Sequence, residues 1–377
     1  RLSSQGDGSL GYLLGFYYED YEELRVSTNH WSGSQEALEA EGLGSNPAFS
    51  LSSTDSTADQ SAVFGEISYA LNSKWELMLG ARWFDYERLD VANAVEGARN
   101  GIIPRVAAEQ PADEKGAIYK ANINYTPNSD VLLYAQYSEG FRLGFGQSLP
   151  TLETCDTDND GKLDFTEAPL SSQVDSDSTT NIELGAKLVL LDDRLVVNAA
   201  IFHIDWKDIP LRQRDTSSEC SATLRYNGGE ARSQGADLEI QYYVTPGLQL
   251  SISTGYVDAE LQNDTATGSK GDRLPMSAHF NGNIGIDYSF EVVGYPTFVR
   301  ADYNYVGGYY SDINRSKPEV GDYGKLNLRA GVEIGQFDIA VYGTNLTNED
   351  AVLAQEIDIS GFSLAGRVMG IDVGYKF

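Results

Sequence analysis

Most of this 377-residue chain consists of segments in which apolar and polar residues alternate, and this alternation restricts the fold more than any other feature. In the stretch ADLEIQYYV, Ala236, Leu238 and Ile240 fall on one side, whereas Asp237 and Glu239 fall on the other. A period of two residues places successive side chains on opposite faces of a β-strand. The chain is therefore predicted to be all-β, with strands that are apolar on one face only.

The joins between these segments alternate in length. Strands are predicted near 9–24, 61–71, 74–91, 115–125, 130–145, 179–190, 193–211, 229–244, 247–262, 278–290, 295–311, 321–334, 336–348 and 363–377. The joins within ALNSKW, TPNSD, LLDDR, VTPG and IGQ are short, whereas the others are mostly long: 25–60, 92–114, 146–178, 212–228, 263–277, 312–320 and 349–362. Short turns at one end and long loops at the other are typical of an outer-membrane β-barrel, and a soluble β-sandwich has no reason to sort its loops in this way.

The end of the chain and its aromatic residues favour the same interpretation. The last ten residues, VMGIDVGYKF, alternate and finish on Phe377, which resembles the signal read by the barrel assembly machinery. Aromatic side chains recur near the predicted strand ends, as the interfacial girdles of a membrane barrel require: Tyr17, Tyr18, Trp75, Trp83, Tyr309 and Tyr310. The formal net charge of -29 argues against nucleic acid as a partner and is compatible with divalent cations.

Five segments resemble, in their order and spacing, the barrel half of TonB-dependent outer-membrane receptors. They are SEGFRLGFGQ (138–147), NIELGAK (181–187), FHIDWKDI (202–209), NGGEARSQGADLEI (227–240) and VYGTNLTNED (341–350), and the hairpin FGEISYALNSKWELMLGARWFDYE (64–87) precedes them. The resemblance implies a 22-stranded barrel with an N-terminal plug. About fourteen strands and the tail of another at residues 1–5 are visible here. Residues 1–377 are therefore expected to form one barrel domain that lacks the plug, the TonB box and the first strands.

The stretch at 156–167 fits the calcium-loop pattern D-x-[DN]-x-[DN]-G-x5-E and lies inside the predicted external loop 146–178. Gly161 provides the sharp turn and Leu163 the apolar residue at loop position 8. Because Ca²⁺ takes six to eight oxygen ligands, the spacing predicts one ion in an EF-hand-like loop. The predicted ligands are Asp156, Asp158, Asp160, the carbonyl of Lys162, Asp164 and Glu167. A solvated acidic loop is the alternative.

Two other groups of residues follow from the predicted barrel. Cys155 precedes the calcium loop and Cys220 lies in the next external loop, so a disulfide between them is expected after passage through an oxidising periplasm.

Polar positions of the alternating strands would face the interior, where they would line the solute path and contact the plug. These predicted lumen-lining residues are Arg82, Glu183, Lys187, Asp237, Glu239, Arg300, Asp302, Lys325 and Arg329. Arg142 is expected to have a structural role near the external end of its strand.

The sequence thus predicts a receptor in the outer membrane of a Gram-negative bacterium. It does not predict an enzyme, because His30, His203 and His279 share no catalytic or metal-binding spacing. The resemblance implies TonB-dependent uptake of a small scarce solute such as a ferric siderophore, a cobalamin-like compound or an oligosaccharide, and it implies the TonB complex, the assembly machinery and lipid as partners. The net acidity disfavours an anionic siderophore unless a local basic cluster forms. A passive 14-stranded channel and a calcium-dependent surface binding module are the alternatives.

Overall fold

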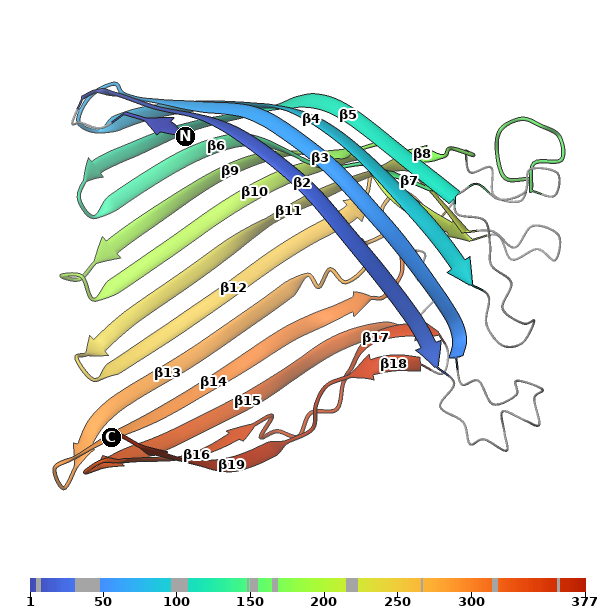
Figure 1. Ribbon diagram of the computed structural model, residues 1–377. Coiled ribbons are helices and arrows are strands. Elements are labelled where there is room, and N and C mark those ends of the chain that lie inside the picture. The colour runs from blue at the N-terminus through green and yellow to red at the C-terminus, as the bar shows by residue number, and fades with distance from the viewer. Residues whose placement is uncertain are drawn as a thin grey trace, which may run out of the picture.

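The described part of the chain forms one large antiparallel sheet and two small two-stranded sheets (Figure 1). The computed structural model describes residues 1–4, 8–30, 48–95, 108–147, 149, 155–164, 169–214, 223–265, 267–313, 318–357 and 360–377. The large sheet contains β1 (Leu2–Ser3), β2 (Leu10–His30), β3 (Ala48–Ala70), β4 (Trp75–Val95), β5 (Ala108–Asn128), β6 (Val131–Arg142), β9 (Asp177–Leu190), β10 (Leu195–Arg214), β11 (Thr223–Thr245), β12 (Leu248–Leu261), β13 (Phe280–Val292), β14 (Tyr295–Tyr310), β15 (Glu319–Ile334), β16 (Phe337–Thr344) and β19 (Val368–Tyr375).

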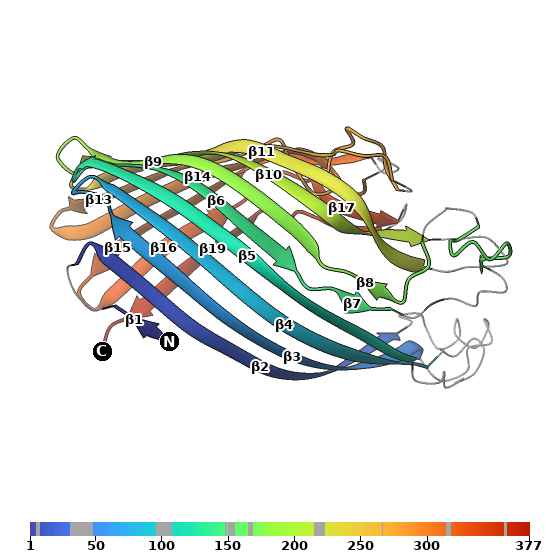
Figure 2. The same ribbon diagram turned by 90° about the horizontal axis from the view of Figure 1, so that it is seen from above.

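Every strand of the large sheet pairs with the next of its strands along the chain, which confirms the all-β prediction and its fourteen long strands. The sheet curves into an open trough, with the short turns gathered at one end and the long connections at the other (Figures 1 and 2). The short turns join β3 to β4, β5 to β6, β9 to β10, β11 to β12, β13 to β14 and β15 to β16. β1 and β19 form the two edges. No helix among the described residues is long and apolar enough to cross a membrane.

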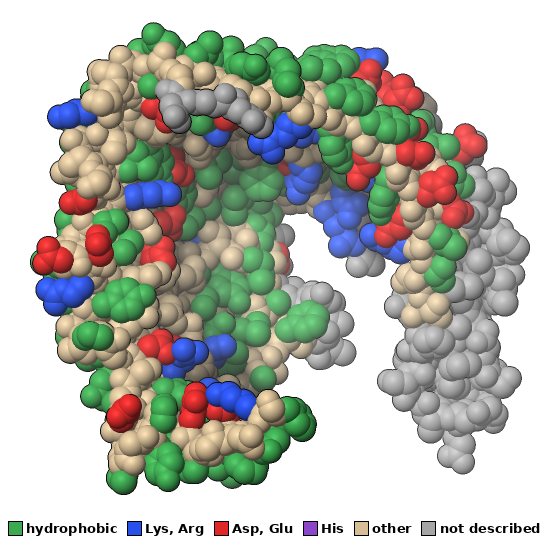
Figure 3. Space-filling view, turned by 60° about the vertical axis from the view of Figure 1, so that its left-hand side comes forward, with side chains coloured by type: hydrophobic (Ala, Val, Ile, Leu, Met, Phe, Trp, Pro, Cys, Tyr) green, Lys and Arg blue, Asp and Glu red, His purple; other side chains and the backbone are tan. Residues whose placement is uncertain are grey.

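Successive residues of each strand lie on opposite faces of the sheet. Glu183 lies between Ile182 and Leu184, which are both exposed, and the same alternation repeats on the neighbouring strands. The exposed face carries a broad set of large apolar residues, among them Leu14, Ile67, Leu79, Leu184, Ile201, Ile284, Leu328, Val341, Ile371 and Val373. Such a face would be costly in water and fits contact with lipid. The opposite face lines the hollow of the trough (Figure 3).

The strands differ in length, so the wall formed by the longer strands is tall. β2, β3, β4, β5, β10 and β11 contain 20–23 residues each, whereas β12 to β16 contain 8–16. A strand crosses a membrane with about 9–11 residues. The tall strands therefore project well beyond the apolar band, on the side of the long connections, and provide an external wall around the mouth.

Two predicted loops contain short strands of their own. The loop 146–178 contains β8 (Gln173–Val174), which pairs with β7 (Phe145–Gly146), and the connection after β16 contains β17 (Val352–Ile357) and β18 (Ser360–Ser363). β7 lies close to β5, where the backbone of Gln110 leaves no room for a Cβ at Gly146. The segment around β7 and β8 is thus packed against the tall wall instead of extending into solvent.

The predicted aromatic girdle is only partly correct. Tyr18, Trp75 and Trp83 are exposed on the apolar face, as expected. Tyr17 lies on the inner face, where the Arg82 guanidinium sits over its ring at 5.5 Å. Tyr309 is only 7% exposed, because it packs against Ala278 and Val320 and donates a hydrogen bond to the carbonyl of Leu353. Tyr17 and Tyr309 are therefore not girdle residues.

Candidate functional site

All nine charged residues predicted to line the interior lie on the face opposite to the exposed apolar residues. A polar row runs across seven neighbouring strands, from Lys187 through Asn198, Glu239, Ser253, Asn283 and Asn304 to Lys325. The other members on these strands occupy inner-face positions above and below this row: Glu183, Asp237, Arg300, Asp302 and Arg329. Arg82 lies on the inner face of β4, beyond the row. Figure 3 shows Lys and Arg side chains gathered on the inner surface of the upper wall.

Two of these charges form ion pairs with described neighbours on the same face. Arg300 pairs with Asp287, and the Nη2 atom of Arg329 lies 2.7 Å from a carboxylate oxygen of Asp372. Glu183 accepts a hydrogen bond of 2.7 Å from the Tyr134 hydroxyl. Lys187, Asp237 and Glu239 line a cavity of about 620 Å³ against the wall. A polar surface of this kind can hold water, a solute or another protein segment.

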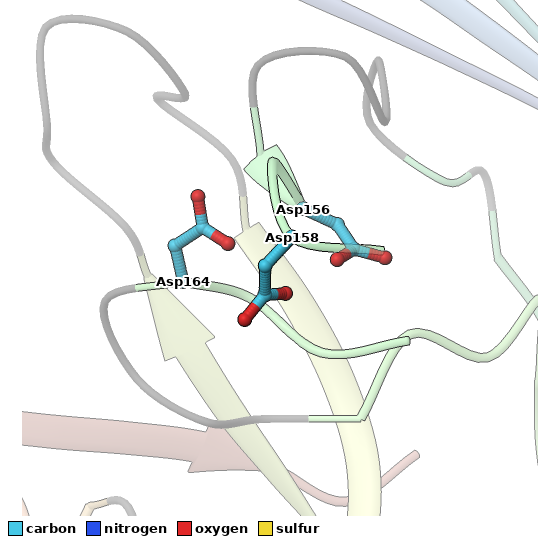
Figure 4. A group of neighbouring side chains, drawn as sticks. All are labelled: Asp156, Asp158 and Asp164. Carbon is cyan, nitrogen blue, oxygen red and sulfur yellow. The ribbon is translucent and has the colours of Figure 1, made fainter. Parts of the chain in front are cut away.

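The acidic loop brings three of its predicted ligands together. One oxygen each of Asp156, Asp158 and Asp164 lies within 4.8 Å of the others, and Figure 4 shows the three carboxylates around one small space. Asp160 instead accepts a hydrogen bond of 2.9 Å from the Lys162 amide, and its carboxylate lies 3.8 Å from the Lys162 ammonium. The sixth predicted ligand, Glu167, lies outside the described residues.

The backbone of the loop turns as the calcium-loop pattern requires. Asn159 and Gly161 have φ angles of 57° and 83°, in the region that favours Asn and Gly. The Asp156 carboxylate accepts hydrogen bonds from the amides of Asp160 and Gly161, at 3.0 and 3.1 Å. Because an ionised carboxylate has about four lone-pair sites, acceptor capacity remains for a cation.

Leu163 anchors the acidic loop to the outer end of the sheet. Its side chain is 0% exposed and belongs to an apolar cluster with Cys155, Ile209, Leu211, Leu224, Tyr226 and Ala231. Ile209 and Leu211 belong to β10, and the next three belong to β11, so the loop packs against one face of the β10–β11 hairpin. This contact fixes the acidic loop beside the mouth.

Cys155 is part of the same cluster and is 2% exposed. No free cysteine thiol occurs among the described residues, and the predicted partner Cys220 lies outside them. The pairing of these two residues therefore stays a prediction.

Arginine side chains gather at the external end of the inner face. Arg142, the last residue of β6, donates two hydrogen bonds to Asp177, which also accepts a hydrogen bond of 2.8 Å from the Trp206 indole. On β4, Asp90 accepts two hydrogen bonds from Arg88 and thereby raises the pKa of the guanidinium, although burial lowers it. Arg88, Asp90, Arg142 and Arg225 line one cavity of about 410 Å³.

Sequence reasoning missed most of this cluster. Arg142 was singled out by the segment SEGFRLGFGQ, and its position at the end of β6 agrees with the expected structural role. Trp206 lies in the quoted segment FHIDWKDI but was not singled out, and Asp177 and Arg225 had no local signal. Each of the three belongs to a different strand, and the pairing of those strands brings them together. The local basic cluster that the sequence left open is thus present at the mouth.

The two histidine side chains that the structure describes have separate surroundings. The Nε2 atom of His203 lies 3.5 Å from Asp205 on β10, whereas the Nδ1 atom of His279 lies 2.9 Å from the carbonyl of Val257. The side chain of His30 lies outside the described part of the chain. Asp156, Asp158 and Asp164 form the one acidic or histidine-containing group among the described residues that is close enough to share a metal ion.

Comparison with known proteins identifies the family. The TonB dependent receptor-like, beta-barrel family matches residues 2–346, which is most of the chain. The chain belongs to this family of TonB-dependent receptors. This assignment and the neighbours place it in the outer membrane of a Gram-negative bacterium, with the short turns on the periplasmic side and the long loops outside.

Three similar proteins illustrate the likeness. The chain is 29% identical over 278 residues to the metal-pseudopaline receptor CntO of Pseudomonas aeruginosa (strain UCBPP-PA14), a match that covers 74% of this chain and 35% of that protein. The ferric yersiniabactin uptake receptor FyuA from Yersinia pestis has a TM-score of 0.77 at 18% identity, covering 98% of this chain and 52% of that one. The siderophore receptor PiuA from Acinetobacter baumannii has a TM-score of 0.71 at 19% identity, covering 99% and 54%. The chain thus spans about half the length of these solved receptors, and about a third of CntO is matched.

Proposed function

We propose that this chain forms part of the barrel wall of a TonB-dependent receptor that imports a scarce metal as a soluble chelate. The observation that carries the proposal is the polar inner face, on which a row of polar residues crosses seven neighbouring strands from Lys187 to Lys325. The family is one of transport receptors, and the names of CntO, FyuA and PiuA concern metal or siderophore uptake. A cobalamin-like compound and an oligosaccharide fit the inner face less directly, since neither needs its arginines.

The remaining partners follow from the same proposal. The exposed apolar face would contact outer-membrane lipid, and Phe377 with the alternating C-terminal strand would be recognised by the barrel assembly machinery. Energy would come from the TonB complex acting on a plug within the barrel. The nine inner-face charged residues would then contact either that plug or the passing solute.

Metal-limited growth of a strain that depends on the complete receptor tests this function. We expect the strain to grow on a metal chelate only when the receptor is present, and a protonophore to abolish chelate accumulation because the TonB complex requires the proton gradient. A passive channel would let the chelate enter the periplasm at the same rate with and without the protonophore. Growth and accumulation that are independent of the receptor for every metal chelate supplied would refute the proposal.

We further propose that the acidic loop binds one Ca²⁺ outside the cell. The support is the convergence of Asp156, Asp158 and Asp164, together with the left-handed turns at Asn159 and Gly161. These carboxylates are the hard oxygen ligands that Ca²⁺ prefers, and the Lys162 carbonyl and Glu167 would complete the ligand set. A single loop of this kind is expected to bind with a dissociation constant on the order of 10⁻⁴–10⁻³ M, as extracellular modules do.

Calorimetric titration of the complete receptor with Ca²⁺ tests the loop. Asp156→Ala and Asp164→Ala are expected to abolish binding, whereas Asp192→Ala, in the turn at the opposite end, is expected to leave it unchanged. Equal calcium affinity in all three variants and the wild type would exclude the site. Uptake by the same variants then distinguishes a gate from a structural ion: unchanged uptake means that calcium only orders the loop.

We also propose that a Cys155–Cys220 disulfide holds this loop beside β10 and β11. The burial of Cys155 against the β10–β11 cluster supports it. Peptide mapping of the receptor by mass spectrometry should recover the two cysteines in one cross-linked peptide without reductant and in separate peptides with it. Recovery of two separate, alkylated cysteines from the unreduced receptor would contradict the pairing.

A further inference from the structure

The pairing of β5 with its two neighbouring strands ends at different heights. On one side, β5 stays paired with β4 up to Ala108, which lies opposite Ala92. On the other side, its pairing with β6 ends at Lys120, which lies opposite Ser138. Figure 2 shows β5 and β6 separating toward the external end. Among the described residues, the external part of β5, residues 108–119, therefore has a strand neighbour on one edge only.

Aromatic packing explains why β6 leaves β5. Phe141, near the end of β6, stacks on Phe84 of β4 with 3.9 Å between the ring centroids. Phe84 is 3% exposed and lies opposite Gly116 of β5. A Cβ atom at Gly116 would come within 2.6 Å of the Phe84 ring, so the missing side chain leaves room for this stack. The end of β6 therefore crosses the inner face of β5 instead of continuing beside it.

Tyr119 marks the point where the free edge of β5 begins. Its backbone amide donates a hydrogen bond of 3.0 Å to the Glu139 carboxylate of β6, so this amide faces the side that β6 has left. Backbone N–H and C=O groups point to the same edge of a strand at every second residue. The residues whose backbone groups face the free edge are therefore Ala117, Lys115, Asp113 and Pro111.

Most of this row of backbone groups is unused. Pro111 has no N–H group, and proline within a sheet is found on free edges, which agrees with its position here. The side-chain amide of Gln173 donates a hydrogen bond of 3.4 Å to the carbonyl of Asp113. The described residues provide no other hydrogen bond to the edge-facing backbone groups of residues 113–117. The N–H groups of Asp113, Lys115 and Ala117 thus remain available.

The side chains along the free edge lie on the outer face and are mainly acidic. Asp113 is the last member of a row of carboxylates that crosses four neighbouring strands: Asp20, Asp59, Glu87 and Asp113. The Lys115 ammonium is already paired with the Asp85 carboxylate at 2.8 Å. Charged outer-face residues place this edge beyond the apolar band, outside the cell. Like charges directly opposite each other destabilise a sheet, so a strand added here would need a basic residue opposite Asp113.

We propose that the free edge of β5 binds an extended basic segment of another protein by antiparallel strand addition. Unpaired N–H and C=O groups at strand spacing match an extended backbone, and the place that β6 has left is that of an antiparallel strand. Lysine or arginine at every second position of the segment would lie beside the outer-face carboxylates. Pro111 and the Glu139 contact would bound the added strand at its two ends. The inference is independent of the solute that the receptor imports.

Binding of a fluorescent synthetic peptide to the complete receptor in detergent, measured by anisotropy, tests the proposal. The probe alternates threonine and lysine over about eight residues, a length typical of a strand. In an antiparallel pair, the lysines on the outer face have the N–H groups that face β5. We therefore expect N-methylation of the lysines to abolish binding and N-methylation of the threonines to preserve it. A peptide of alternating threonine and glutamate should not bind.

Receptor variants test the same contact from the other side. Ala117→Pro removes an edge-facing N–H group and leaves the pairing with β4 intact, and it is expected to weaken binding of the lysine peptide about tenfold. Asp113→Asn removes the facing charge and should weaken binding about twofold to fivefold. The matched control is Asp20→Asn, in the same carboxylate row but on β2, which should leave the affinity unchanged.

Four outcomes would overturn the proposal: no binding of the lysine peptide at millimolar concentration, equal affinity of the two N-methylated peptides, unchanged affinity in Ala117→Pro, or an equal loss in Asp20→Asn and Asp113→Asn. If Ala117→Pro does not reach the outer membrane, the two N-methylated peptides still decide the question with the wild-type receptor.

Discussion

Replacing Leu163 by alanine should release the acidic loop from the mouth while leaving the sheet intact. Leu163 is fully buried, and its cluster joins the loop to Leu211 and Leu224 on the β10–β11 hairpin. A buried Leu→Ala change costs about 2–5 kcal/mol. Because the loop is attached to the sheet mainly by this cluster, the cost should fall on docking of the loop. At about 1.4 kcal/mol for each factor of ten, the undocked population should rise about 30-fold to several thousandfold.

Hydrogen exchange of the complete receptor measures this opening directly. The informative amides are those of Gly161, Asp164 and Leu170, which donate hydrogen bonds within the loop. Their exchange should accelerate by the same factor in Leu163→Ala, and exchange in β12 should not change. A reducing buffer prevents the predicted disulfide from holding the loop. Leu24→Ala, at an exposed position of the external wall, serves as the control. Unchanged protection of the three amides in Leu163→Ala would refute the docking argument.

Two further changes test other contacts, with urea unfolding of the receptor as the measurement. Asp177→Asn removes a buried charge that accepts hydrogen bonds from both Arg142 and Trp206, so we expect the free energy of unfolding to fall by about 1–3 kcal/mol. An equal fall in Asp20→Asn, on the exposed face of β2, would show that these contacts are not responsible. The buried side-chain amide of Asn345 forms hydrogen bonds with the backbone of residues 349 and 365, and the φ angle of Asn345 is 49°. Asn345→Ala should therefore lower the free energy of unfolding by about 2–4 kcal/mol. Unchanged unfolding of Asn345→Ala would contradict this assignment.

The strand pattern was predictable because alternation is a local property of the sequence. The exposed Ile182 and Leu184 on either side of the inward Glu183 can be read without knowledge of the neighbouring strands. The predicted ends were less accurate, since β2 to β5 extend beyond the apolar band, and the outer parts of β3 and β5 are rich in polar and small residues. Tyr309 was misassigned because its burial depends on the distant Leu353 and Val320, which local periodicity does not report.

The candidate site was predictable only where its residues are close in sequence. The acidic loop is a single motif, so Asp156, Asp158 and Asp164 were identified, although the docking of the loop through Leu163 was not. The arginine cluster combines residues from β4, β6 and β11, and its composition depends on strand register. In the same way, β7 and β8 have only two residues each, too few to produce a periodic signal.

The outer end of the β10–β11 hairpin has two different sides. One side packs against the acidic loop through Leu211 and Leu224, and the other carries Arg212 and Arg225, the next residues along each strand. A cation bound by the acidic loop would therefore act on the same two strands that carry the arginine pair. The proposed calcium site would in that way link the external calcium concentration to the rigidity of the outer end of these strands.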